Sequence, residues 1–423
     1  MKCRVEKSKI SGHIICPSNK SYTHRAIFIA SLSDGKSIIK NILKSSDTIA
    51  TINACKNFGV ELTESENKII IKNSISSKVD GCIIDACNSG TTIRIAAAIA
   101  VLSHGKTVLS GDDSLKKRPM KPVLDALESM GAKCSSAKGK PPISVEGEVK
   151  GGEVQVSGSI SSQFISALMI VAPRLANGLV LNIQNELVSK PYLDMTIATM
   201  DKFGINVKTE IPYQKYIIKH QNYKATNFTI PSDFSSLALL LSSAVLLGNK
   251  LEIELSMGDM PQADEAIIDI LEILGVVVTL EKNIIKIKSP EKLTGGKFDL
   301  SDSPDLLPAI AILSLKSAKP IKIFNVKHAR YKETDRIAIL ARELVKLGIN
   351  VIENDDGLIL KPAKKLVSAT LCSENDHRLF MAFCIAGMYV GDCSITDPES
   401  VGISYPNFVS EMKKIGGKIF LDE

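Results

Sequence analysis

Cationic and polar side chains recur directly before the apolar helical runs of this sequence, where they could bind anions. Ser, Asn and Asp at a helix start often only cap free backbone amides, and we assign that role alone to Asp233. Other side chains at these starts exceed what a cap requires: Lys20, Arg25, Gln163, His377 and Arg378. Because the amide-rich amino terminus of a helix attracts negative charge, this pattern predicts a site for anionic ligands.

A second set of polar residues lies in turns that precede other helices. It comprises Arg118, Ser189, Tyr192, Lys332, Glu333 and Arg336. In the segment 332–336, Thr334 can cap the helix, and the charged residues fall within one turn. A solvated charged face would produce the same pattern, so these residues alone leave both interpretations open.

The elements that must position these side chains form an internal repeat. A helical run, a large apolar residue followed by Gly, and a strand recur at Gly59, Gly131, Gly204, Gly275, Gly348 and Gly416. The ends of apolar helices repeat in phase with these glycines, roughly every 70 residues. The sequence therefore predicts six α/β units of the order β-α-β-α-β-β, whose helix starts would converge on one cleft if the units pack symmetrically.

The composition excludes several classes of protein. The chain has 423 residues, of which 44% are hydrophobic and 23% charged, unlike a disordered chain or a coiled-coil rod. The longest apolar stretch, 237–247, is too short to cross a bilayer, and the amino terminus lacks the apolar core of a signal peptide. Nine scattered cysteines without a CxxC pair indicate reduced thiols. We therefore expect a cytoplasmic protein without a membrane partner.

The net charge of +6 permits anionic ligands but does not require nucleic acid. Aromatic residues make up only 5% of the chain and Trp is absent, so little material is available for stacking on bases. No nucleic-acid partner is expected.

Seven motifs, in this order, resemble the EPSP synthase family, the 3-phosphoshikimate 1-carboxyvinyltransferases. They are SNKSYTHRA, NSGTTIR, KKRPM, SSQF, VSKPY, KETDR and NDHR, and the resemblance covers essentially the whole chain. It implies an α/β fold with two inside-out α/β domains, each of three β-α-β-α-β-β units. Residues 1–18 and 231–423 would form one domain and 19–230 the other, with the active site in the interdomain cleft.

The resemblance also implies a reaction and its partners. The family transfers the enolpyruvyl group of phosphoenolpyruvate to the 5-hydroxyl of shikimate 3-phosphate and releases phosphate, in the shikimate pathway to aromatic amino acids. The reaction needs no metal or other cofactor. Both substrates are anionic, which would explain why Lys and Arg gather at helix starts and turns. We expect a monomer whose domains close around these small molecules, and sensitivity to glyphosate, because Gly90 is unsubstituted.

Site residues carry over from the family one by one. Those expected to bind shikimate 3-phosphate are Lys20, Ser21, Arg25, Ser161, Ser162, Gln163, Ser189, Tyr192, Asp305, His328 and Lys332. Those expected to bind phosphoenolpyruvate are Lys20, Gly90, Arg118, Gln163, Arg336 and Arg378.

The resemblance further assigns catalytic roles to Asp305, Glu333 and Lys20. Asp305 would accept the proton of the 5-hydroxyl, Glu333 would protonate the methylene carbon, and Lys20 would touch both substrates. The residues alone leave simpler roles open, because Asp305 could cap a helix and Glu333 could pair with a neighbouring cation. His377 receives no assigned role.

Two positions depart from the family pattern. His328 stands where many members have Asn; both side chains can donate a hydrogen bond, but a histidine could introduce pH dependence. Ile403 stands where the family often has a Lys that reaches phosphoenolpyruvate. Either the other cations suffice or the affinity for phosphoenolpyruvate is weakened.

The residues leave two alternative functions open. The first is an enolpyruvyl transferase acting on a UDP-linked amino sugar, which typically carries a reactive Cys near the position of DSLKKRPM, where this chain has none. The second is a non-catalytic anion-binding protein, which should present a broad basic stripe rather than cations at separate helix starts.

Overall fold

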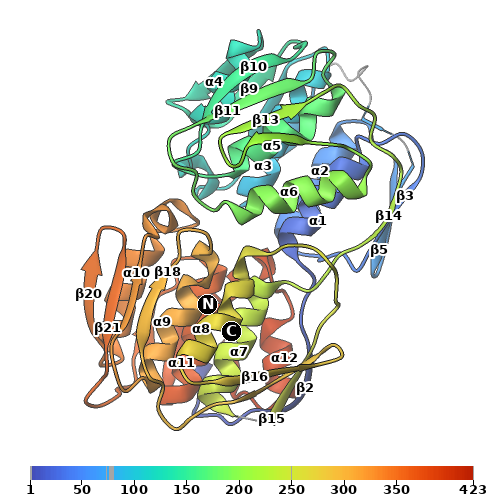
Figure 1. Cartoon of the computed structure of the whole chain (residues 1–423). Coiled ribbons are helices and arrows are strands. Elements are labelled where there is room, and N and C mark those ends of the chain that lie inside the picture. Colours follow the sequence, from blue (N-terminus) through green and yellow to red (C-terminus); the bar gives the residue numbers. More distant parts are fainter. Residues whose placement is uncertain (1, 73, 76–80, 249, 423) are drawn as a thin grey trace. The chain divides into compact units, whose positions relative to one another are not determined.

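The computed structural model describes residues 2–72, 74–75, 81–248 and 250–422, and the chain divides into two compact units, which we call unit 1 and unit 2 (Figure 1). Unit 1 comprises Met1–Pro17, Ser232–Met257 and Ala263–Glu423, and unit 2 comprises Ser18–Pro231 and Gly258–Gln262. The last of these segments packs with unit 2 because Asn19 Nδ2 donates to Gln262 Oε1 and the Tyr22 hydroxyl donates to the carbonyl of Pro261, both at 2.6 Å.

Helices and strands alternate along unit 2. Its helices are α1 (Lys20–Ala30), α2 (Ser46–Asn57), α3 (Gly90–Ile99), α4 (Lys121–Ser129), α5 (Gln163–Val171) and α6 (Pro191–Lys202). Its strands are β3 (Ser37–Lys40), β4 (Leu62–Ser65), β5 (Lys68–Ile71), β6 (Ile83–Asp85), β7 (Thr107–Ser110), β8 (Lys133–Ala137), β9 (Lys140–Glu146), β10 (Gly152–Ser157), β11 (Leu179–Gln184), β12 (Lys208–Ile211), β13 (Lys215–Ile218) and β14 (Asn227–Thr229).

Unit 1 repeats the same alternation. Its helices are α7 (Phe234–Leu247), α8 (Ile267–Ile273), α9 (Leu307–Leu313), α10 (Arg336–Lys346), α11 (His377–Val390) and α12 (Phe408–Lys414). Its strands are β1 (Lys2–Val5), β2 (Ser11–Ile15), β15 (Lys250–Glu254), β16 (Val277–Glu281), β17 (Ile284–Lys288), β18 (Gly296–Asp299), β19 (Ile321–Phe324), β20 (Asn350–Asn354), β21 (Gly357–Lys361), β22 (Thr370–Leu371), β23 (Cys393–Thr396) and β24 (Ile419–Asp422).

The described residues form six four-stranded sheets, which confirms the six predicted repeats. The strand orders are β14-β3-β5-β4, β6-β7-β9-β8, β10-β11-β13-β12, β16-β17-β15-β2, β18-β19-β21-β20 and β22-β23-β1-β24. Each sheet contains one parallel pair of neighbouring strands, and its other two pairs are antiparallel. The six glycines that mark the repeat all have positive φ, from 79° to 105°, which Gly adopts without a steric penalty.

Three of the sheets depart from the predicted contiguous order β-α-β-α-β-β. Each contains a strand from a distant part of the chain: β14 pairs with β3, β2 pairs with β15, and β1 lies between β23 and β24. Strands β14, β2 and β1 are far in sequence from the strands with which they pair. Their pairing depends on distant segments, so the local pattern does not reveal it.

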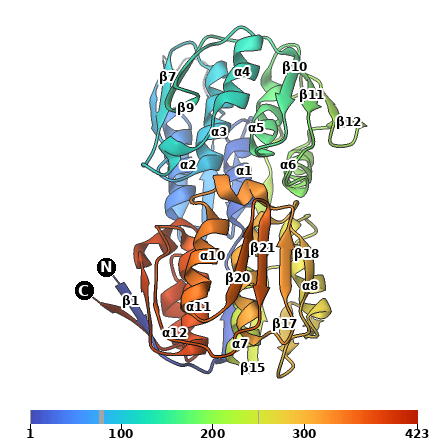
Figure 2. The ribbon, with the colours of Figure 1, turned by 90° about the vertical axis from the view of Figure 1, so that its left-hand side faces the viewer.

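Buried helices fill the interior of each unit, and the sheets lie outside them. In unit 1, every residue of α9 is buried, as are nearly all residues of α7 and α11. Helices that are apolar on all sides must be enclosed, and burying each large aliphatic side chain stabilises the fold by roughly 1.5–3 kcal/mol. Strands β18, β20 and β21 cover the outside of this unit in Figure 2.

In helices α1 and α5 of unit 2, the residues that are not fully buried lie only at the start, where predicted site residues are found. In unit 2, α1 buries all of its residues except Lys20 and Ser21, and α5 buries all except Gln163. An apolar core therefore fixes each helix while its amino terminus stays accessible.

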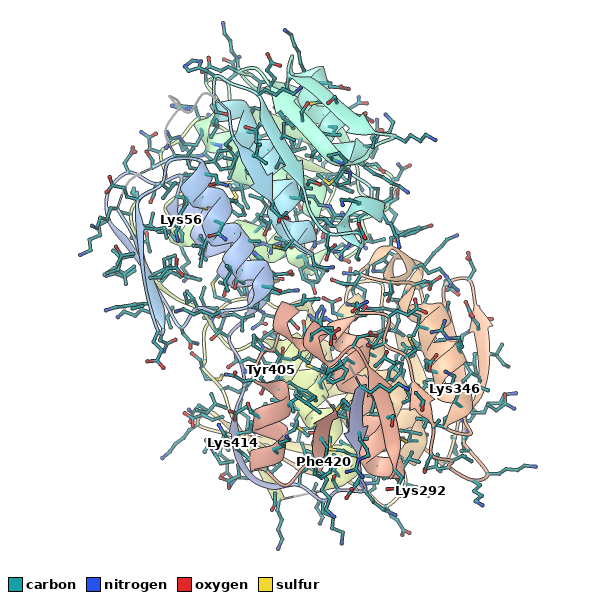
Figure 3. The ribbon with its side chains drawn as sticks, turned by 180° about the vertical axis from the view of Figure 1, so that it is seen from behind. Lys56, Lys292, Lys346, Tyr405, Lys414 and Phe420 are labelled. Carbon is teal, nitrogen blue, oxygen red and sulfur yellow. The ribbon has the colours of Figure 1, made fainter. Side chains whose placement is uncertain are left out.

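Lysines on the surface pair with nearby carboxylates. Figure 3 labels Lys56, Lys346 and Lys414, whose Nζ atoms lie 2.6–2.8 Å from Glu oxygens. The pairs of Lys56 and Lys414 are exposed and contribute little to stability, whereas the partner of Lys346, Glu343, is buried. No helix among the described residues is long and apolar enough to cross a membrane.

Candidate active site

The start of α1 presents Lys20 beside a buried carboxylate. The Asn19 side chain caps the helix by accepting a hydrogen bond from the Tyr22 amide at 2.8 Å, which leaves Lys20 at the first turn. Lys20 Nζ lies 3.0 Å from Asp47 Oδ2, in the first turn of α2. Sequence reasoning missed Asp47, because an acidic residue in a first helical turn is ordinary.

Arg25 holds two other predicted residues of unit 2 in place. Its Nε donates to Thr196 Oγ1 at 2.8 Å, and its Nη atoms donate to the carbonyls of Ser21 and Tyr192, each at 3.1 Å. Burial lowers the pKa of Arg25 to about 10, so the guanidinium is still charged at neutral pH. The side chain therefore joins α1 to α6.

Two guanidinium groups flank Gly90 at the start of α3. A Cβ atom at Gly90 would lie 3.0 Å from Arg94 Nη1 and 3.2 Å from Arg118 Nη1. Arg118 Nη2 donates to Asn88 Oδ1 at 2.7 Å, which fixes that side chain directly before the helix. The absence of a side chain at Gly90 therefore leaves the two arginine ends unobstructed.

Arg94 is a functional candidate that sequence reasoning missed. Its Nη1 donates to Gln163 Oε1, and its guanidinium carbon lies 4.8 Å from the centre of the Phe164 ring. A charged residue inside the otherwise apolar helix GTTIRIAAAI was a usable signal, because a buried charge needs a partner. Arg94 links α3 to the start of α5.

The remaining predicted residues of unit 2 lie in two turns. Ser161 and Ser162 directly precede α5, and Ser161 Oγ accepts a hydrogen bond from the Gln163 amide at 3.2 Å. Ser189 has a φ of 57°, a conformation that non-glycine residues rarely adopt, and its carbonyl accepts from the Tyr192 amide at 3.2 Å.

In unit 1, one buried guanidinium collects three carboxylates. Arg336, at the start of α10, is 1% exposed. Its Nη1 lies 2.8 Å from Asp305 Oδ1, its Nη2 lies 2.7 Å from Glu333 Oε2, and its Nε lies 2.8 Å from Asp376 Oδ2. Burial alone would lower the pKa of Arg336, but these carboxylates raise it above its ordinary value. We call Asp305, Lys332, Glu333, Arg336, Asp376 and Arg378 the Arg336 cluster.

Asp305 is the carboxylate that contacts the most cations in this cluster. Besides Arg336, it lies 3.5 Å from Lys332 Nζ and 3.4 Å from Arg378 Nη2. It lies inside the 3-10 helix η5 (Pro304–Leu306), with its carboxylate turned toward these cations. The predicted acid and base, Glu333 and Asp305, therefore share one arginine.

Asp376 is a second missed residue, and it organises the start of α11. Its Oδ1 accepts hydrogen bonds from the Arg378 amide at 2.9 Å and the Leu379 amide at 3.3 Å, as a helix cap does. Its Oδ2 accepts from Arg336 and from Thr334 Oγ1. The sequence motif NDHR contains Asp376, but an aspartate at this position is expected as a helix cap, so the motif offered no reason to assign it another role.

Two predictions about caps have different outcomes. Asp233 caps α7, as expected, by accepting from the Ser235 amide at 3.0 Å. Thr334 could have capped the next helix but does not. The helix begins one residue later, and the Asp335 side chain accepts from the Ala338 amide at 3.0 Å.

His328 is buried next to the Arg336 cluster. Burial lowers its pKa to about 4, and the nearby positive charge of Lys332 adds to this effect. The ring is therefore neutral from mildly acidic pH upward, so its own titration does not introduce pH dependence near neutrality.

Each unit thus holds one group of the predicted site residues. Unit 2 contains Lys20, Ser21, Arg25, Gly90, Arg118, Ser161, Ser162, Gln163, Ser189 and Tyr192. Unit 1 contains Asp305, His328, Lys332, Glu333, Arg336 and Arg378. Within the described ranges, no group of three or more His, Cys, Asp and Glu side chains has an arrangement that could hold a metal ion.

The chain is similar to known proteins over its whole length. The family model of EPSP synthase (3-phosphoshikimate 1-carboxyvinyltransferase) matches residues 5–412. A 3-phosphoshikimate 1-carboxyvinyltransferase from Nitrosopumilus maritimus is 62% identical over 421 residues, covering 99% of each chain. One from Methanosphaera stadtmanae is 41% identical over 427 residues, covering 98% of this chain and 99% of its own.

Solved structures share the fold. An EPSP synthase from Acinetobacter baumannii superposes with a TM-score of 0.81 at 24% identity, covering 100% of both chains. The enolpyruvyl transferase NikO from Streptomyces tendae gives a TM-score of 0.78 at 15% identity, covering 99% of this chain and 98% of its own. The predicted architecture of two inside-out α/β domains is confirmed. With the family model and the close relatives in agreement, the resemblance of the seven motifs is confirmed, and the chain belongs to the EPSP synthase family.

Proposed function

We propose that this protein transfers the enolpyruvyl group of phosphoenolpyruvate to the 5-hydroxyl of shikimate 3-phosphate and releases phosphate. The observation that carries this proposal is the shared contact of Arg336 with Asp305 and Glu333, at 2.8 and 2.7 Å. The reaction needs a base and an acid close to a group that binds anions, and this arginine joins all three. Membership of the family supports the same reaction.

The cations supply the charge that two anionic substrates need. We propose that Lys20, Arg94 and Arg118 of unit 2 and Lys332, Arg336 and Arg378 of unit 1 bind the phosphates and carboxylates. All four arginines of this set are buried, so water would only weakly screen their interactions with a bound anion. Guanidinium groups suit these ligands because they donate two parallel hydrogen bonds.

The active site is proposed to lie in a cleft between folding domains formed by 1–18 with 231–423 and by 19–230. Closure of the domains around the substrates would expel water and bring the two groups of residues together. Lys20 is proposed to touch both substrates. Ser161, Ser162, Ser189 and Lys332 are proposed for the 3-phosphate, and Gln163 and Tyr192 for the shikimate ring.

The chemistry divides into addition and elimination. Asp305 accepts the proton of the 5-hydroxyl while the oxygen bonds to C2 of phosphoenolpyruvate, and Glu333 donates a proton to C3, which becomes a methyl group. In the elimination Glu333 takes a proton back from C3, the double bond re-forms as the bond from C2 to the phosphate oxygen breaks, and Asp305 gives its proton to the departing phosphate. The anions of the substrate compete with Asp305 and Glu333 for Arg336, which would free both carboxyl groups for proton transfer.

The alternative function, enolpyruvyl transfer to a UDP-linked amino sugar, is less well supported than transfer to shikimate 3-phosphate, because it typically uses a reactive Cys near the turn 111–120. Cys87 lies beside the turn 111–120, since its backbone carbonyl accepts a hydrogen bond from the Asp112 amide at 2.9 Å. Burial raises the pKa of Cys87, and Asp85, Asp47 and Asp112 raise it further. Such a thiol is a poor nucleophile at neutral pH.

The finer properties are also proposals. We expect a monomer in the cytoplasm that binds no nucleic acid, and inhibition by glyphosate at the phosphoenolpyruvate site.

The activity can be tested by phosphate release from the purified protein. We expect release only when phosphoenolpyruvate and shikimate 3-phosphate are both present. Each substrate alone is the control. If folded protein releases phosphate no faster with both substrates than with either one alone, the proposed function is refuted.

Gly90→Ala is expected to weaken the binding of phosphoenolpyruvate. The added methyl group would lie 3.0 Å from Arg94 Nη1 and 3.2 Å from Arg118 Nη1, closer than ordinary contact, so at least one guanidinium must shift. We expect the KM for phosphoenolpyruvate to rise about tenfold, because small displacements of binding groups have large effects. Steady-state kinetics measure this, with the KM for shikimate 3-phosphate as internal control. An unchanged KM for phosphoenolpyruvate would show that Gly90 does not border its site.

Ile403→Lys is expected to strengthen the binding of phosphoenolpyruvate. Ile403 ends the 3-10 helix η8 (Pro398–Ile403), and nearby Tyr405, labelled in Figure 3, is buried against Phe408 at 5.8 Å between ring centres. This anchor holds the segment in place, and a partly exposed cation there should lower the KM about fivefold, roughly 1 kcal/mol.

The control for this substitution is Ile403→Gln, which adds polarity without charge and should leave the KM near that of the wild type. Equal KM values for the Lys, Gln and wild-type proteins would mean that the other cations already suffice.

A further inference from the structure

A buried carboxyl group next to the Arg336 cluster has no role in the chemistry described above. Asp264 lies in the 3-10 helix η4 (Ala263–Ala266) and is 4% exposed. Its Oδ2 accepts a hydrogen bond from Ser235 Oγ, at the start of α7. Among the residues that the structure describes, no donor reaches its Oδ1. Ionising a buried carboxyl group with one unsatisfied oxygen is costly.

Asp264 is tied to the turn that carries Asp305. Ser303 Oγ donates to the carbonyl of Ala263 at 2.7 Å, and Asp305 follows two residues after Ser303. Arg378 faces the same region, and its Nη1 is buried with no acceptor among the described residues. An unsatisfied acceptor and an unsatisfied donor thus border the proposed base.

The neighbouring charges favour the protonated form of Asp264. Burial raises its pKa to about 7, and the carboxylates of Asp305 and Asp233 act in the same direction. The Ser235 hydrogen bond and the positive charge of Arg378 oppose them. Since Asp264 and Asp305 interact, their protons belong to a coupled pair.

Carboxylates outnumber cations around this point. The five carboxyl groups are Asp233, Asp264, Asp305, Glu333 and Asp376, and the three cations are Lys332, Arg336 and Arg378. A bound phosphate or carboxylate adds further negative charge. Because nearby negative charge favours protonation, an anionic ligand should increase the proton occupancy of the least stabilised carboxylate.

We propose that Asp264 is a positioning residue that takes up a proton from solvent when anionic substrate binds to the Arg336 cluster. One O–H bond forms on its carboxylate and no other bond changes. The uptake removes one negative charge, which leaves Arg336 and Arg378 to the substrate and keeps Asp305 ionised as the base. This inference rests on the proposed function.

The first test needs no substrate and compares thermal stability at several pH values. The folded-state pKa of Asp264 is raised above its ordinary value of 3.8. The folded protein therefore holds more protons than the unfolded chain between about pH 4 and pH 7, so this group lowers stability as pH rises through that window.

Asp264→Asn cannot ionise. We expect its Tm to match that of the wild type near pH 5 and to exceed it by about 3 °C at pH 8. Asp269→Asn, an exposed position on α8, is the matched control and should follow the wild type at every pH. A Tm difference between Asp264→Asn and wild type that does not change with pH would overturn the inference.

The second test measures proton uptake during binding of shikimate 3-phosphate. Calorimetry near pH 7 in buffers of different ionisation enthalpy gives the protons taken up per ligand bound. We expect Asp264→Asn to take up about half a proton fewer than the wild type, and Asp269→Asn to match the wild type. The ligand's own phosphate contributes equally to all three proteins.

The outcomes separate the two proposals. Equal proton uptake by wild type and Asp264→Asn, with binding intact, would overturn the role of Asp264 alone. No binding of shikimate 3-phosphate by the folded wild type would refute the proposed function and this inference with it, whatever the pH dependence of the Tm.

Discussion

Asp305→Asn and Glu333→Gln are each expected to lower kcat by about 10²- to 10⁴-fold, the usual contribution of a positioned acid or base. Each substitution keeps the shape of the side chain but removes its ability to transfer a proton. Asp305 and Glu333 both contact Arg336, and the amide oxygens of Asn and Gln can still accept a hydrogen bond from it. The KM values should therefore change much less than kcat.

Steady-state kinetics with both substrates measure this effect, and Asp302→Asn is the matched control. It makes the same chemical change three residues before Asp305 and should leave kcat near the wild-type value. If Asp305→Asn or Glu333→Gln kept wild-type turnover, the proton-transfer role of that residue would be wrong.

Arg336→Ala is expected to destabilise the protein by about 3–5 kcal/mol, because it removes the partner of buried charges. Arg336 is 1% exposed and holds Asp305, Glu333 and Asp376 within 2.8 Å. Without the guanidinium, these carboxylates keep their desolvation cost but lose their shared counter-charge. Activity should be lost as well, since the same arginine is proposed to bind phosphoenolpyruvate.

The matched control is Arg342→Ala, on the same helix. Arg342 is 50% exposed, and it pairs with Glu343 and Glu374 at 2.6 and 2.8 Å. Lys346 also pairs with Glu343, so this variant should lose about 1 kcal/mol or less. Urea unfolding compares the two. Equal losses for Arg336→Ala and Arg342→Ala would contradict the importance of the buried cluster.

The six-unit fold could be predicted because its landmarks are local. The repeat glycines must have positive φ where a helix ends and a strand begins, and Gly204 and Gly348, with φ of 79° and 94°, illustrate this. The strand exchange could not be predicted from the repeats. The pairing of β1 with β23 joins residues nearly 400 apart in sequence, such as Lys2 and Thr396, and no local pattern encodes it.

The sequence motifs singled out candidate site residues, but they did not show which side chains from other helices contact those residues. The motif SNKSYTHRA contains Lys20, but the contact of Lys20 with Asp47 depends on the packing of α1 against α2. Asp376 both caps α11 and binds Arg336, and the sequence pattern indicates only the cap. Asp264 lies outside every motif, and only burial beside the Arg336 cluster reveals it.

The central claim is tested most directly by identifying both products of one reaction. Purified protein incubated with phosphoenolpyruvate and shikimate 3-phosphate can be followed by phosphorus NMR and mass spectrometry. The proposed function predicts equal amounts of inorganic phosphate and of shikimate 3-phosphate carrying an enolpyruvyl ether on its 5-oxygen, and neither product with Asp305→Asn. Phosphate without the ether, or an enolpyruvyl product only with a UDP-linked amino sugar, would contradict it.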